Sequence, residues 1–116
     1  PIDLVVMDVS FISARLLLPG LRERAPAAQW LVMVKPQFEL GRGQVGKGGV
    51  VRDPALRTEA VESVAVEARS LGLLERGRAD SRLPGPKGNR EIFLWLEPAP
   101  PPPRADAVTG GAPGRS

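Results

Sequence analysis

The sequence predicts an α/β fold in which parallel strands alternate with helices and the last strand runs antiparallel. Two Val-rich apolar runs, "LVVM" at 4–7 and "LVMV" at 31–34, are typical of strands buried on both faces of a parallel sheet. A third run, "IFLWL" at 92–96, follows a short polar connection, so it should run antiparallel to the strand before it. Helical patterns lie between the strands, and this alternation favours right-handed crossovers.

The elements follow in a simple order. A strand at 4–8 leads to a crossover helix that starts near Ser13, although Pro19 and Gly20 leave its boundaries open. After the strand at 31–35, a long loop leads to the clearest helix, at 54–71, with Asp53 as its N-cap and Gly72 as its terminator. A weaker strand at 73–82, the turn "LPGPKGN" and the final strand complete the fold.

The chain is expected to hold one ordered unit. With 116 residues, it is long enough for one small domain or for part of a larger one. The α/β pattern covers 1–96, and the Pro-, Gly- and Ala-rich stretch 97–116 is predicted to be a disordered tail. The chain begins Pro1-Ile2-Asp3 without an initiator Met, so we expect a fragment of a longer protein. No signal segment and no apolar run of roughly 20 residues is present, so we expect a cytoplasmic protein.

Composition limits the chemistry and suggests a partner. Cysteine and histidine are both absent, which excludes disulfides, thiolate metal sites and a histidine base. Proton transfer must therefore use Lys, Asp, Glu or water. The net charge is only +3, but basic residues gather in two loop regions, which suits a polyanion such as nucleic acid, although a solvated face would look similar. These residues are Arg42, Lys47 and Arg52 in the first region and Arg76, Arg78, Arg82, Lys87 and Arg90 in the second.

The stretch "GRGQVGKGG" at 41–49 has the spacing G-x-x-x-x-G-K of a phosphate-binding loop, but its surroundings argue against that function. A working P-loop follows a strand directly and opens a helix. Here the strand ends at Lys35, the next cap signal waits until Asp53, and Gly48 replaces the Ser or Thr that would hold magnesium. The glycine loop therefore has another task, or is simply flexible.

Three charged residues are predicted to meet at one rim of the sheet. Asp8 and Lys35 end parallel strands, and ligands of open α/β sheets bind beyond those ends. Glu91 begins the antiparallel final strand, so it should lie on the same rim. Taken singly, Asp8 could be a cap, Lys35 a solvated strand end and Glu91 the partner of an arginine. Their common position favours a shared crevice.

Three blocks of sequence carry a resemblance to a known family. "DLVVMDVSFIS", "LVMVKPQFELGRGQVGKGGVVRDP" and "LPGPKGNREIFLWL" resemble the C-terminal half of the TlyA (haemolysin A) family of FtsJ-like RNA methyltransferases, from about Ile2 to Leu96. The resemblance implies a partial Rossmann-like, S-adenosylmethionine-dependent methyltransferase fold. It also implies methylation of a ribose 2′-hydroxyl in ribosomal RNA, with ribosomal RNA or ribosomal subunits as partners and no metal.

The resemblance assigns roles to the three rim residues. FtsJ-like enzymes use a Lys-Asp-Lys-Glu tetrad, in which Asp8 matches the acid, Lys35 the second lysine and Glu91 the final glutamate. Asp8 would also lie near the cofactor's sulfonium. The first lysine and the glycine-rich cofactor loop belong to the half that this chain does not contain, so we expect the chain by itself to be inactive. A lysine acts as a base only if its pKa falls from about 10.4 towards roughly 7–8. The sequence leaves two roles open for Lys35, which either accepts the proton or only orients the hydroxyl.

Contacts with RNA are expected from the loops. The phosphate-binding candidates are Arg42, Lys47, Arg52, Lys87 and Arg90, and the glycine loop should overhang the crevice. Phe38 either stacks on an extruded base or packs under that loop.

Three rival functions remain open at this stage. One is a nucleotide triphosphatase in which the acid of "LVVMD" binds magnesium. Another is a non-catalytic RNA-binding module. The third is a membrane-lytic protein, which the sequence disfavours because no amphipathic stretch has a broad apolar face with a basic rim.

Overall fold

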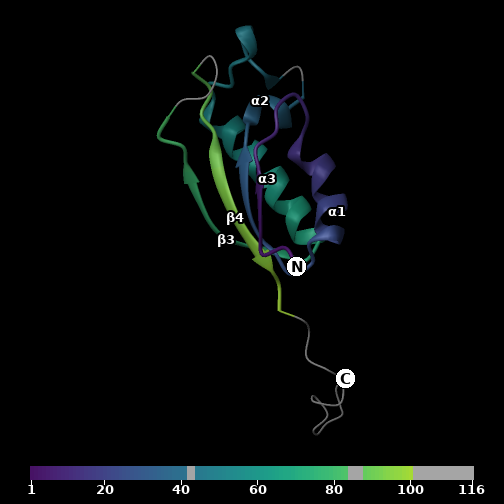
Figure 1. The fold of residues 1–116 in the computed structure, drawn as a ribbon. Coiled ribbons are helices and arrows are strands. Elements are labelled where there is room, and N and C mark those ends of the chain that lie inside the picture. The colour runs from purple at the N-terminus through teal and green to yellow at the C-terminus, as the bar shows by residue number, and fades with distance from the viewer. Residues whose placement is uncertain (42–43, 84–87, 101–116) are drawn as a thin grey trace, which may run out of the picture.

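The computed structural model describes residues 1–41, 44–83 and 88–100 (Figure 1). Arg42, Lys87 and the tail from residue 101, which the sequence predicted to be disordered, lie outside the described residues. In chain order the elements are β1 (Leu4–Met7), α1 (Ala14–Arg24), β2 (Gln29–Val34), α2 (Pro36–Glu39), the 3₁₀ turn η2 (Lys47–Gly49), α3 (Pro54–Ser70), β3 (Leu73–Asp80) and β4 (Ile92–Pro98).

The strands form a four-stranded sheet in the order β1-β2-β4-β3. β1 and β2 are parallel, and β4 is antiparallel to both of its neighbours, β2 and β3. The α/β fold with parallel strands and an antiparallel last strand, predicted from the apolar runs, is therefore confirmed. Because β1 lies at the edge of the sheet, one side of its backbone has no strand partner within the described part of the chain.

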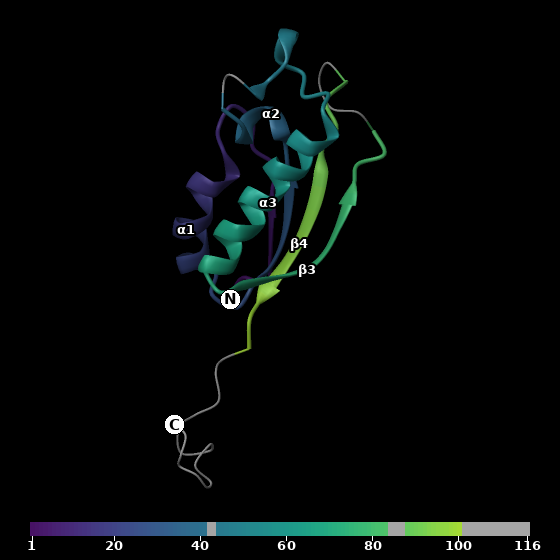
Figure 2. The same ribbon diagram turned by 180° about the vertical axis from the view of Figure 1, so that it is seen from behind.

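α1 and α3 lie against one face of the sheet (Figure 2), and the core fills the space between these layers. Alternate residues of β2 and β4 point into it, because strand side chains alternate between faces. The fully buried apolar residues of β2, β4 and α3 are Trp30, Val32, Val34, Leu94, Leu96, Ala60, Val64 and Ala68. On the other face, which no described helix covers, the side chains of Val6 and Trp95 are 64% and 46% exposed.

The helix boundaries follow the predicted capping residues. The Ser13 side chain accepts a hydrogen bond from the backbone N–H of Arg15, and the Asp53 carboxylate accepts one from the N–H of Ala55. Gly72 follows α3 with φ of 81°, in the left-handed region that glycine occupies without strain. Pro19 lies inside α1 without ending it, and the residue before it, Leu18, is fully buried.

Two sequence-based expectations are wrong in detail. The segment after Lys35 is not wholly a loop, since Pro36 opens the short helix α2 at a position that proline favours. The last strand is also longer than the expected 92–96, because β4 continues to Pro98. Glu97 pairs with Leu74 of β3, and its carboxylate lies 2.9 Å from the Nε of Arg76. These contacts stabilise the last residues of β4.

No helix in the described ranges is long and apolar enough to cross a membrane.

Because one face of the sheet is buried and the other is exposed, truncating a side chain should destabilise the protein more on the buried face than on the exposed face. Leu94→Ala removes a fully buried side chain and should lower the free energy of unfolding by about 2–5 kcal/mol. Val6→Ala, on the exposed face, should change it by no more than about 0.5 kcal/mol. Urea unfolding of the two variants beside the native chain measures both values. Equal losses would show that the exposed face is covered when the protein is free in solution.

Candidate functional site

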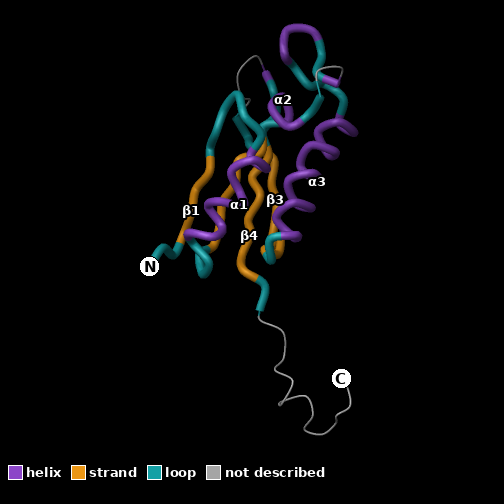
Figure 3. The backbone as a smooth tube through the Cα atoms, turned by 90° about the vertical axis from the view of Figure 1, so that its right-hand side faces the viewer, coloured by secondary structure: helices purple, strands orange, loops and turns teal. Residues whose placement is uncertain are grey.

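The site lies at one end of the sheet, where β1 and β2 finish and β4 begins. Figure 3 shows α2 and several loops gathered beyond this end of the strands. Because β1 and β2 are parallel, with Met7 paired to Val32, the residues that follow them emerge on the same rim. This is the edge at which open α/β sheets bind ligands.

Asp8 and Lys35 meet at this rim. The Nζ of Lys35 lies 2.6 Å from Oδ1 of Asp8, and it donates a second hydrogen bond of 3.0 Å to Oγ of Ser10. The Lys35 side chain is only 11% exposed, whereas that of Asp8 is 54% exposed. The amine is thus held by two acceptors from the loop after β1, and about half of the Asp8 side chain remains accessible to solvent.

Glu91 reaches the same rim from β4. Val34 pairs with Ile92 across the antiparallel strands, so Lys35 and Glu91 are the next residues of those two strands at this end. Glu91 is buried, and its backbone oxygen accepts a hydrogen bond from the N–H of Ser81. Among the described residues, no ion pair joins its carboxylate to Lys35. The structure therefore brings all three predicted residues to one rim and puts two of them in direct contact.

A cavity of about 440 Å³ has Lys35 in its wall. Its walls come from four segments that are distant in sequence, namely the loop after β1, α2, the glycine loop and the entry to β4. The lining residues are Ser10, Phe11, Lys35, Gln37, Phe38, Val45, Gly49 and Asn89. Most of these walls are apolar, and Lys35 is the charged residue among those that line the cavity.

Two aromatic rings form part of this wall. The rings of Phe11 and Phe38 are 5.1 Å apart between centroids and tilted by 51°. Phe11 is 89% exposed and has φ of 66°, a conformation that bulky residues rarely adopt. Phe38 is half-buried and shares the cavity wall with Val45 and Gly49, so it lies beside the glycine loop as well as beside the hollow.

The glycine loop borders the cavity and does not open a helix. The N–H of Gly46 donates to the carbonyl of Val50, and a Cβ on Gly46 would lie 2.5 Å from that oxygen, so a side chain is excluded there. Lys47 begins a 3₁₀ turn of three residues, and α3 starts only at Pro54. This arrangement lacks the helix N-terminus of a P-loop and agrees with the sequence argument against one.

Asn89, which no sequence pattern singled out, fastens the glycine loop to the entry of β4. Its side chain accepts a 2.8 Å hydrogen bond from the N–H of Val51 and donates one of 2.8 Å to the carbonyl of Gly49. Asn89 is 2% exposed. Ser10 and Phe11 were also not singled out. The sequence signal for these residues is their position, two or three residues after Asp8 or two residues before Glu91.

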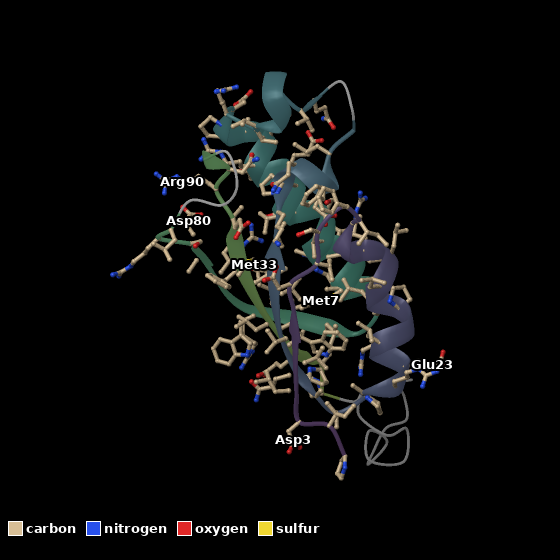
Figure 4. All side chains as sticks on the ribbon, turned by 45° about the horizontal axis from the view of Figure 1, so that its top comes forward. Asp3, Met7, Glu23, Met33, Asp80 and Arg90 are labelled. Atoms are coloured by element: carbon tan, nitrogen blue, oxygen red, sulfur yellow. The ribbon has the colours of Figure 1, made fainter. Side chains whose placement is uncertain are left out.

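The predicted RNA-binding residues have separate outcomes. Arg52 and Arg90 are exposed, and Figure 4 shows the Arg90 side chain pointing away from the body of the protein. Lys47 contributes its backbone to η2, while Arg42 and Lys87 lie outside the described residues.

Two arginines of the second basic region are engaged with acids instead. Arg76 pairs with Glu97, and Arg78 lies within 2.9 Å of a Glu62 oxygen and 2.6 Å of a Glu75 oxygen. The hydrogen bond from Arg78 lowers the pKa of Glu75, and burial opposes this effect only in part. These two arginines therefore serve the fold more than a polyanion.

Within the described ranges, no group of three or more acidic side chains gathers as a metal site would require.

Comparison with known proteins gives the family. Residues 1–98 match the FtsJ-like methyltransferase family. The chain is 54% identical over 96 residues to the "16S/23S rRNA (cytidine-2'-O)-methyltransferase TlyA" of Mycobacterium tuberculosis, a match that covers 82% of this chain and 36% of that protein. It is 40% identical over 95 residues to the "Putative rRNA methyltransferase YqxC" of Bacillus subtilis, covering 81% of this chain and 34% of the relative. The chain thus spans about a third of the length of these relatives.

A solved structure shares the fold. The "putative hemolysin" from Lactococcus lactis superimposes with a TM-score of 0.78 at 38% identity, over 82% of this chain and 46% of that one. The arrangement of strands and rim described above, the sequence match over residues 1–98 and this structural likeness agree with one another. The chain therefore belongs to the FtsJ-like methyltransferase family.

Proposed function

We propose that this chain forms the acceptor side of an S-adenosylmethionine-dependent methyltransferase that modifies a ribose 2′-hydroxyl of ribosomal RNA. The observation that carries the proposal is Lys35, which lines a mostly apolar cavity and whose amine is held by Asp8 and Ser10. The family match supports methyl transfer, and the name of the Mycobacterium tuberculosis relative supports ribosomal RNA and the 2′-oxygen.

The chemistry requires a well-placed hydroxyl and a destination for its proton. Methyl transfer to an oxygen is accelerated when the reacting atoms are held in line, and a neighbouring base removes the proton. Lys35 is the candidate to hold the hydroxyl or to take its proton, because it lines the cavity and its amine is held by Asp8 and Ser10. Asp8 fixes that amine, and Glu91, on the next strand of the rim, is placed to hold the ribose.

Of the contacts that the cofactor needs, the described part of this chain offers one, a carboxylate for its positive charge. S-adenosylmethionine, when bound, supplies the methyl group from a positively charged sulfur. Asp8 keeps 54% of its side chain exposed beyond its contact with Lys35, so its negative charge is available to a cation on that side. We assign the remaining cofactor contacts to the portion of the relatives that lies outside the match, and we propose that this portion also covers the exposed sheet face around Val6 and Trp95.

The cavity and the basic loops suit an RNA substrate. A nucleobase is flat and apolar on its faces, and proteins that bind unpaired RNA stack such bases on aromatic rings. Phe11 and Phe38 supply those rings beside Lys35. Arg52 and Arg90 are exposed near the two segments that Asn89 ties together, where they can meet phosphates.

A non-catalytic RNA-binding module remains the alternative, and methyl transfer decides between the two. The test protein is this chain joined to the portion of the Mycobacterium tuberculosis relative outside the match, incubated with labelled S-adenosylmethionine and ribosomal RNA. Label in the RNA ribose supports the enzyme. RNA binding with no label, in a folded protein that binds the cofactor, supports the module.

Lys35→Ala and Asp8→Ala should each reduce methyl transfer by the joined protein about 100-fold or more, because each removes a member of the pair that aligns the hydroxyl. The initial rate of label incorporation measures the effect. Circular dichroism controls for folding, and Arg24→Ala, at the far end of α1, is the matched control for loss of a basic side chain. A Lys35→Ala protein with native activity would contradict the proposed role of the amine.

Phe11→Ala and Phe38→Ala should each weaken RNA binding by roughly 5- to 100-fold, since stacking of one base on an aromatic ring contributes about 1–3 kcal/mol. Fluorescence anisotropy with an unpaired RNA oligonucleotide gives the affinities. Phe11→Tyr and Phe38→Tyr keep the rings and should bind normally. If the Ala variants retain affinity and only lose thermal stability, the rings pack for the fold and do not bind a base.

Arg52→Glu and Arg90→Glu should lower RNA affinity at every sequence tested and reduce the salt slope of binding by about one each, since each removes one phosphate contact. Titrations at several salt concentrations measure the slope. Arg24→Glu makes the same charge change on the last turn of α1, away from the rim, and should leave the slope almost unchanged. An equal effect from all three variants would show only a general response to net charge.

A further inference from the structure

Glu39 is a buried carboxylate that the chemistry proposed above does not use. It is the last residue of α2 and lies four residues after Lys35 in the sequence. Its side chain is only 2% exposed. A buried charge is costly unless hydrogen bonds satisfy it. The hydrogen bonds of the Glu39 carboxylate therefore show which segments it stabilises.

Those contacts all go to the start of α1. One carboxylate oxygen accepts a 2.5 Å hydrogen bond from the Ser13 hydroxyl and lies 3.2 Å from Nε of Arg15. The other accepts a 2.7 Å bond from the backbone N–H of Ala14. Free N–H groups and the positive end of the helix dipole favour an anion at this position. Glu39 thus anchors the end of α2 to the first turn of α1.

The loop between Asp8 and Ser13 is consequently tied to α2 at two places. At one end, Asp8 and Ser10 hold the Lys35 amine, and Lys35 is the residue that caps α2. At the other end, Ser13 and Ala14 are held by Glu39. Between the two ties, Phe11 has the left-handed φ of 66°, which a loop keeps only when its surroundings enforce it.

We propose that Glu39 is a positioning residue for Lys35. By fastening the far end of the loop, it keeps Asp8 and Ser10 against the amine. The ion pair cannot do this alone, because Asp8 is half-exposed and exposed ion pairs contribute little stability. α2 has only four residues and gains almost no stability of its own, so its direction depends on its two ends. The catalytic consequence rests on the proposed function, but the structural link does not.

The first test uses this chain itself and needs no activity. The side-chain amine of Lys35, labelled with ¹⁵N, should give an NMR signal protected from exchange with water by its bonds to Asp8 and Ser10. Glu39→Ala should abolish that protection together with that of the Ala14 amide, and Glu39→Gln, which keeps an acceptor oxygen, should restore most of both. Val64→Ala, which truncates a fully buried side chain of α3, is the control for general loss of stability and should leave the Lys35 signal protected.

The second test uses the joined protein described above. Glu39→Ala should lower kcat for methyl transfer by about 10- to 100-fold, as expected for a displaced catalytic group, while KM for RNA changes little. Glu39→Gln should recover most of kcat, and Val64→Ala should retain it at a temperature at which all variants are folded.

Two results would overturn the inference. One is a Glu39→Ala chain in which Lys35 stays protected, and the other is a variant that loses thermal stability but keeps kcat, since either would make Glu39 a helix cap only. If the unsubstituted joined protein transfers no methyl group, the proposed function fails, and the NMR experiment alone then decides the role of Glu39.

Discussion

The parallel pairing of β1 with β2 is the constraint on which the rest of the site depends. Parallel neighbours must be joined by a crossover, and α1 provides it across one face of the sheet. The same pairing makes both strands finish at one end, so Asp8 and Lys35 leave the sheet side by side although 26 residues separate them. The 2.6 Å contact between their side chains is a direct result of that register. A shift by one residue would turn one of the two strands over and separate the charges.

β4 adds the third wall of the site by running the other way. Because it is antiparallel to β2, it starts where β2 ends, and the segment Asn89–Glu91 enters the sheet at the rim. Leu94 and Leu96 fix its register, since both are fully buried against the helices. Asn89 then ties this entry to the glycine loop at Gly49 and Val51. The packing of Leu94 and Leu96 in the core thus also sets the positions of Asn89 and Glu91, which lie outside the core at the rim.

The sequence predicted the features that depend on local pattern. Val-rich runs marked the strands, Asp53 marked the start of α3, and the charge at the end of each apolar run marked the rim. The sequence did not reveal contacts that join distant segments. The bonds of Glu39 to Ser13 and Ala14 and those of Asn89 to the glycine loop span 25 to 40 residues, and no periodicity encodes them. α2 was missed because four residues are too few to show a helical repeat, and the left-handed Phe11 because only the surrounding fold enforces it.

The exposed face of the sheet and the half-exposed Asp8 have a common origin. β1 forms the edge of the sheet, Val6 lies on the face that the described helices leave open, and Asp8 directly follows that strand. Parallel strands are normally covered on both faces, because their side chains are apolar on both. On the proposed function, the same added layer that buries Val6 also removes water from around Asp8 and Lys35. An electrostatic contact strengthens when water leaves, so on the proposed function completing the sheet would also tighten the hold of Asp8 on the Lys35 amine, with Glu39 holding the loop in place before it occurs.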